Sequence, residues 1–194
     1  GEYAIDQYFL NGGKVIAMVD PMFYSARALQ PRQQPGMPPG MQPQGGGPLP
    51  TSDLKSLFEA WGVEYSDSQV VADSTYKTEN RPNDLYAFLS LNGDAMAKDD
   101  PVTAQLHDVR LPFPGGFKVN LEGQPKLKQT TLIESSAQTE LVASYKAEIE
   151  AAADLVKEFT ATGQVYDLAV RIEGEFKSAL SLIHISEPTR PTPI

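Results

Sequence analysis

Four polar side chains are the best-placed candidates for binding a ligand. Each directly follows a predicted strand: Asp20, Asp73, Ser135 and Ser136. Because ligands of open α/β sheets bind beside the carboxyl ends of strands, these residues could line a binding site. The alternative is structural, since a strand-terminal Asp or Ser commonly caps or solvates its own loop.

The other reactive residue types do not assemble into a catalytic or metal-binding motif. His107 is followed by Asp108, but an Asp adjacent in sequence cannot orient the imidazole as a catalytic triad requires. Asp94, Asp99 and Asp100 lack the alternating oxygen ligands of a calcium loop. Phosphate-binding loops, nucleophile elbows and zinc-protease motifs are also absent from the sequence. We therefore predict no catalytic residues, no metal and no cofactor.

Composition narrows the class of protein. The chain has 194 residues, a formal net charge of −9, 41% hydrophobic residues and no cysteine. This length and hydrophobic content favour a globular domain with a true core. The missing cysteine excludes disulfides and a thiol nucleophile within these residues. An acidic net charge does not favour binding to the phosphate backbone of nucleic acid. Even the longest apolar runs, such as Val15–Val19, are far too short to span a bilayer.

The start of the chain indicates an α/β architecture. Ile5, Tyr8 and Phe9 have the spacing of a helix over 2–11, which Gly12 and its neighbour would terminate. The following apolar run, 14–19, has the β-branched character of a strand buried on both faces. A helix followed closely by a buried strand is half of a parallel α/β unit.

Further elements follow from periodicity and turn residues. Residues 51–61 have the apolar spacing of a helix, which Ser52 or Asp53 would cap and Gly62 would end. The Ala- and Glu-rich stretch 139–160 has the apolar spacing of a longer helix. Segments 80–101 and 111–116 are rich in turn residues. The expected short strands are 63–65, 69–72, 117–121, 128–134 and 166–172.

Two segments stand apart from the predicted domain, which comprises residues 1–29 and 51–179. Pro, Gly and Gln make up 17 of the 21 residues in 30–50, which is typical of a disordered insert. Residues Leu180–Pro191 resemble the translation of a transposase-type sequencing adapter, so we expect 180–194 to be a non-native tail. Residue 1 is Gly and already lies in a helical pattern, so we expect the natural protein to extend beyond both ends.

An ordered set of short segments carries a family resemblance. It includes Tyr3–Tyr8, Gly12–Val15 with Val19–Pro21, Asp53–Leu54, Ala60–Glu64, Val70–Asp73, Leu111–Gly115, Glu134–Ser136, Tyr166–Gly174 and Lys177–Ala179. In this order the segments resemble the GldG-type auxiliary component of ABC transporters, a family known from gliding motility.

The resemblance implies a three-layer α/β domain with a mostly parallel sheet, similar to class I glutamine amidotransferases, incomplete here and with extra strands toward the C-terminus. It also implies a location on the extracytoplasmic (periplasmic) face of the bacterial inner membrane, with anchoring segments outside this chain. An ABC permease and an ATPase would be its partners. Amidotransferase chemistry does not transfer, because it needs a cysteine and a His-x-Glu pair, whereas His107 is followed by Asp108 and Val109.

Three functional hypotheses follow. The leading one is a non-catalytic binding or scaffolding subunit of an ABC transporter of the gliding-motility type. The second is an amidotransferase-like or hydrolytic enzyme whose catalytic half lies outside these residues. The third is a carbohydrate- or peptide-binding module that uses the strand edge near Asp20.

Overall fold

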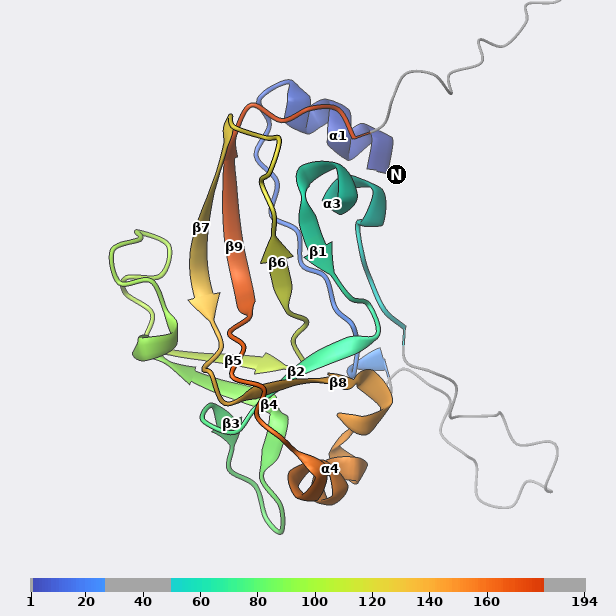
Figure 1. The fold of residues 1–194 in the computed structure, drawn as a ribbon, viewed down its shortest axis with the longest axis vertical. Helices are drawn as coiled ribbons and strands as arrows, with labels where there is room; N and C mark the ends of the chain where they lie inside the picture. Colours follow the sequence, from blue (N-terminus) through green and yellow to red (C-terminus); the bar gives the residue numbers. More distant parts are fainter. Residues whose placement is uncertain (1, 27–49, 180–194) are drawn as a thin grey trace, which may run out of the picture.

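The computed structural model describes residues 2–26 and 50–179. The predicted insert at 30–50, apart from Pro50, and the predicted tail at 180–194 lie outside the described residues. Three short sheets, rather than one continuous sheet, form the body of this part of the chain (Figure 1). None of the described helices is long and apolar enough to cross a bilayer.

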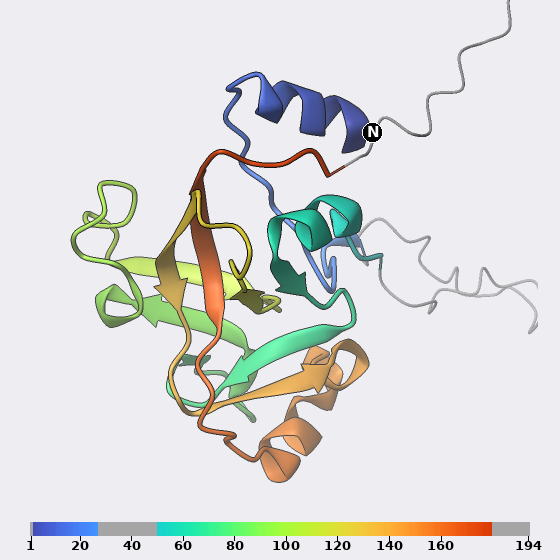
Figure 2. The same ribbon diagram turned by 45° about the horizontal axis from the view of Figure 1, so that its top comes forward.

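A four-stranded sheet forms one end of the described part of the molecule (Figure 1). Its strand order is β1 (Val63–Tyr65), β6 (Phe117–Val119), β9 (Asp167–Gly174) and β7 (Leu127–Glu134). The long β7–β9 pairing runs from Leu127 opposite Gly174 to Glu134 opposite Asp167. Helices α1 (Glu2–Leu10) and α3 (Lys55–Trp61) lie at the same end as this sheet (Figures 1 and 2).

Two smaller sheets complete the body. β2 (Gln69–Asp73) pairs with β8 (Thr139–Ala143), and β4 (Leu85–Asn92) lies between β3 (Lys77–Thr78) and β5 (Asp108–Pro112). The connections between the strands contain helix α4 (Ala152–Glu158) and short 3-10 turns at Gly93–Ala95, Ser144–Lys146 and Ile149–Ala151.

The core consists of three clusters of buried side chains. β2 lies between the first two, because Val70 and Ala72 face one cluster and Val71, on the opposite face of the strand, faces the other. This placement explains why β2 reads as a continuous apolar run. The third cluster is formed by Leu57, Phe58, Trp61 and Val63, with Phe9 and Phe176 packed on Trp61.

The end of α3 and the start of β1 agree with the sequence prediction. Gly62 ends α3 with φ of 72°, and a Cβ there would lie 2.0 Å from the carbonyl oxygen of Asn120. Only glycine fits this left-handed, closely packed position. The helix begins later than predicted, at Lys55, whose backbone N–H donates to the Asp53 carboxylate at 3.2 Å.

The ends of the described chain are joined through one buried carboxylate. Asp6 of α1 is fully buried and accepts hydrogen bonds from the Ser178 hydroxyl at 2.8 Å and from the Ala179 N–H at 2.9 Å. Phe9 adds an edge-to-face contact with Phe176, at 4.3 Å between ring centroids. Helix α1 is therefore held by the segment that follows β9.

Two predicted elements are wrong. Residues 14–20 are not a buried strand: they form no sheet with the described residues, and Ile16 and Met18 are 87% and 90% exposed. A buried strand needs hydrogen-bonded partner strands, and none of the described strands pairs with this segment. The predicted helix 139–160 is instead β8, two 3-10 turns and the short α4, because Val142 pairs with Val70 and joins the first core cluster.

The turn-rich middle of the chain also contains strands that the sequence analysis does not predict, namely β3, β4 and β5. All strand pairs within the described residues are antiparallel, which differs from the expected mostly parallel sheet. No long crossover helix separates successive described strands, and such a helix is the usual connection between parallel strands. The three-layer, amidotransferase-like architecture of a larger domain stays a prediction.

Candidate functional site

Asp73 and Ser136, 63 residues apart in the sequence, lie together at the end of β2. The Ser136 N–H donates to one Asp73 carboxylate oxygen at 2.7 Å, and the Ser136 hydroxyl donates to the other at 2.9 Å. The second oxygen also accepts the N–H groups of Thr75 and Tyr76, at 2.7 and 3.1 Å. Asp73 is fully buried, and its carboxylate is surrounded by four protein donors.

Ser135 is also engaged by the backbone. Its hydroxyl accepts the Tyr166 N–H at 2.8 Å and donates to the Ser136 carbonyl at 3.2 Å. The Ser135 N–H in turn donates to the Tyr166 carbonyl at 2.9 Å. Asp73, Ser135 and Ser136 thus hold the connections between β2, β7 and β9. Their polar atoms are occupied by protein groups, which favours the structural role for this trio.

Asp20 lies elsewhere, next to the start of the α3 segment. Its carboxylate accepts the Met22 N–H at 2.9 Å, and its backbone exchanges hydrogen bonds with Ser52. Burial raises the pKa of Asp20, although the Met22 hydrogen bond opposes the shift. The structure therefore separates Asp20 from the other three predicted site residues.

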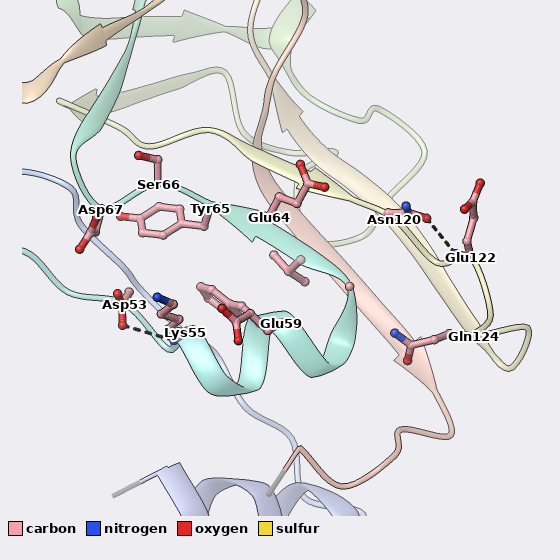
Figure 3. A pocket seen from close by; sticks show the side chains of 13 residues that line it. Asp53, Lys55, Glu59, Glu64, Tyr65, Ser66, Asp67, Asn120, Glu122 and Gln124 are labelled. Atoms are coloured by element: carbon pink, nitrogen blue, oxygen red, sulfur yellow. Dashed lines mark hydrogen bonds between the residues drawn. The ribbon is translucent and has the colours of Figure 1, made fainter.

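A pocket of about 670 Å³ opens near Asp20, between α3, β1 and the 120–124 turn (Figure 3). Five carboxylates and a single ammonium group are among its lining side chains, so its charge is strongly negative. The lining residues are Asp53, Lys55, Phe58, Glu59, Gly62, Val63, Glu64, Tyr65, Ser66, Asp67, Asn120, Glu122 and Gln124.

Tyr65 is the unusual side chain of this pocket. Its hydroxyl is buried and has no hydrogen-bond partner among the described residues. Burial, together with the charges of Asp20, Asp67 and Asp53, raises the pKa of Tyr65, so the phenol stays protonated. The ring stacks on Phe117 at 5.3 Å between centroids. Figure 3 shows Tyr65 beside Asp67, with Asn120 and Glu122 on the other side of the pocket.

The sequence analysis does not select these pocket residues as a site. The rule that selects Asp20 and Asp73 would also have selected Ser66 and Asp67, because both directly follow the strand β1. The contribution of Asn120 and Glu122 depends on the β1–β6 pairing, in which Val63 lies opposite Val119. No local pattern reveals that pairing.

The remaining candidates stay dispersed. His107 is exposed in the loop before β5. Asp100 is buried and forms an ion pair with Arg171 at 2.7 Å, whereas Asp94 pairs with Lys98 at the surface. Within residues 2–26 and 50–179, no three His, Asp or Glu side chains are placed to hold a metal ion together.

Comparison with known families supplies the context that the geometry lacks. The model of a family described as an ABC-type uncharacterized transport system matches residues 2–186. The chain belongs to this family. No curated protein and no solved structure matches it significantly.

Membership in the ABC-type transport family identifies the chain as an auxiliary component of such a system. Its match runs across all described elements, from α1 to β9. The family description implies association with a transport system and suggests a role other than catalysis.

Proposed function

We propose that this chain is a non-catalytic binding or scaffolding domain of an ABC transporter of the gliding-motility type, on the extracytoplasmic face of the bacterial inner membrane. The family match over residues 2–186 is the observation that carries the proposal. It is supported by the polar trio Asp73, Ser135 and Ser136, whose side chains bond to protein groups. An ABC permease and its ATPase are the proposed partners.

Co-purification tests the partners. The full-length protein, tagged and extracted from its native membrane in mild detergent, is expected to carry a permease and an ATPase with it. Recovery of the protein in the freely soluble fraction without either subunit would overturn the proposal. An acyl-transfer or amide-hydrolysis activity of the purified protein would favour the enzyme hypothesis instead.

The absence of cysteine makes the proposed location directly testable. Tyr145 is 69% exposed, so Tyr145→Cys, in a full-length protein whose cysteines outside residues 1–194 have been replaced by serine, offers a single accessible thiol. A membrane-impermeant maleimide is expected to label this variant in cells whose outer membrane has been permeabilised and whose inner membrane is intact. Labelling only after lysis of the inner membrane would place the domain in the cytoplasm. The cysteine-free parent is the matched control.

The acidic pocket favours a second candidate function, a peptide-binding module that accepts a cationic side chain. Its volume lies within the range of small-ligand sites. Thermal-shift measurements with short lysine- and arginine-containing peptides test this candidate. Asp67→Asn removes a pocket carboxylate and is expected to reduce the shift, whereas Asp99→Asn removes an exposed charge outside the pocket and is expected to leave it unchanged. An equal response of both variants would exclude the pocket.

A further inference from the structure

The segment Lys14–Asp20 is an extended apolar stretch that no described strand covers. The side chains of Ile16 and Met18 are 87% and 90% exposed. The backbone groups of residues 14–19 form no hydrogen bonds with any part of the chain that the structure describes. Figure 1 shows this segment in blue, running from the end of α1 toward β2 and β8. Extended segments with unsatisfied backbone groups are templates for pairing with another strand.

One edge of this segment is occupied at its Asp20 end, and the other edge is open along its length within the part of the chain that the structure describes. The Asp20 N–H donates to the Ser52 hydroxyl at 2.9 Å, and the Asp20 carbonyl accepts the Ser52 N–H at 2.8 Å. Backbone groups of successive residues in an extended strand point to opposite edges, and those of alternate residues point to the same edge. The N–H and C=O groups of Val15, Ala17 and Val19 therefore point away from Ser52, toward the free edge.

We propose that this free edge pairs with the same segment of a second copy of the chain, in an antiparallel ladder centred on Ala17. The two-fold symmetry of a homodimer requires an antiparallel arrangement of identical strands. With Ala17 opposite Ala17, the hydrogen-bonded positions of the ladder are residues 15, 17 and 19. These are the residues whose backbone groups lie on the free edge.

The sequence of the segment is complementary to itself in this register. Lys14 lies opposite Asp20 of the second copy, and the symmetry repeats this pair at the other end of the ladder. Val15 lies opposite Val19, and Ile16 lies opposite Met18. Cross-strand apolar and opposite-charge pairs both stabilise antiparallel strands. The charge pairs at both ends favour a second copy over an unrelated apolar strand as the occupant.

The faces of the segment agree with this arrangement. Val19 packs against the third core cluster, which holds this end of the segment on its own domain. Ile16 and Met18 project from the other face, where the non-hydrogen-bonded pairs bring their side chains close to those of the second copy. A ladder of seven residues is a small interface, so we expect a weak, concentration-dependent dimer.

Sedimentation of the 194-residue chain over a wide concentration range tests the proposal. Ala17→Pro removes the central N–H donor, which has no partner among the described residues, and proline tolerates extended backbone. It is expected to weaken dimerisation at least tenfold. Ala17→Val keeps the donor and is expected to preserve the dimer.

A charge variant separates the proposed register from other modes of association. Lys14→Glu places a glutamate opposite Asp20 at both ends and is expected to weaken the dimer about tenfold, whereas Lys98→Glu makes the same charge change outside the segment and is expected to have no effect. Lys14 is exposed, so this variant also serves if Ala17→Pro fails to fold. A monomer at all concentrations, or a dimer that Ala17→Pro and Lys14→Glu leave unchanged, would overturn the proposal.

Discussion

The Asp73 carboxylate joins the end of β2 to the β7–β8 connection, and its removal should loosen both. Asp73→Ala leaves the N–H groups of Thr75, Tyr76 and Ser136 without their acceptor. These donors lie near the surface, so each orphaned N–H should cost toward the lower end of the usual range, about 1 kcal/mol. The Ser136 hydroxyl keeps Thr75 Oγ1 as a neighbour at 3.0 Å. We therefore expect a loss of about 3 kcal/mol in the free energy of unfolding.

Two milder substitutions at this site calibrate that estimate. Asp73→Asn retains the shape and one acceptor oxygen, but its NH₂ group faces the Ser136 N–H, so we expect a loss of about 1–2 kcal/mol. Ser136→Ala removes one hydroxyl donor and keeps the backbone donor, for which we expect about 1 kcal/mol. The order of destabilisation should be Asp73→Ala, then Asp73→Asn, then Ser136→Ala.

Urea denaturation measures these differences. The chain has a single tryptophan, Trp61, which is 8% exposed in the third core cluster, so its fluorescence reports on unfolding. Circular dichroism at far-ultraviolet wavelengths provides a second probe, and coincident transitions would justify two-state analysis. The structural interpretation of Asp73 is wrong if Asp73→Ala changes the unfolding free energy by less than about 1 kcal/mol. A stable Asp73→Ala variant that had lost ligand binding would instead restore Asp73 as a site residue.

Three further perturbations test other features of the structure. Gly62→Ala forces a Cβ against the Asn120 carbonyl at a positive φ, so we expect a loss of more than about 2 kcal/mol in urea denaturation, and an unchanged stability would contradict the left-handed helix end. Arg171→Met removes the partner of the buried Asp100 carboxylate, and we expect a lower free energy of unfolding in urea denaturation. Lys98→Met, at an exposed ion pair, should have a much smaller effect, and an equal effect of the two variants would contradict this difference. The pKa of Asp20 is raised above its ordinary value, so the folded state binds this proton more readily than the unfolded state, and stability relative to Asp20→Asn should increase as pH falls through the raised pKa toward 3.8. The difference in melting temperature between these two proteins from pH 7 to pH 4 measures that effect, and a difference that does not vary with pH would contradict it.

Short local signals predict helix α3 and three of the strands. The apolar spacing around Leu57 and Trp61 and the terminating Gly62 predict α3, and its end at Trp61 agrees with the structure. The segments 63–65, 69–72 and 128–134 also agree closely with β1, β2 and β7. These elements are short and well bounded by turn residues, so little besides local sequence is needed to define them.

The elements that the sequence analysis does not predict depend on distant partners. The stretch 139–160 has good helix propensity, but its first five residues gain more from antiparallel pairing with β2, because tertiary packing overrides weak propensities. The strand β4 lies between two turn-rich segments and carries the alternating burial of Ala87, Leu89 and Leu91. Turn residues on both sides mark the boundaries of a strand as readily as they mark a loop.

The contacts of the candidate site residues depend on residues far away in the sequence. The strand-end rule selects Asp73 and Ser136, and both carry strong polar interactions, but the sequence could not show that these interactions join the two residues to each other across 63 positions. The acidic pocket depends equally on a distant pairing, that of β1 with β6. The prediction that Asp20, Asp73, Ser135 and Ser136 bind a ligand stays untested.

The bond from Asp6 to Ser178 and Ala179 has a consequence for the order of folding. It closes a loop of more than 170 residues, so forming it early would cost considerable chain entropy. Helix α1 contributes no other fully buried residue and should dock only after β9 has been incorporated. The amides of α1 should therefore exchange with solvent sooner than those of β2. Removal of the segment after Gly174 should also detach α1, although the two lie more than 160 residues apart in the sequence.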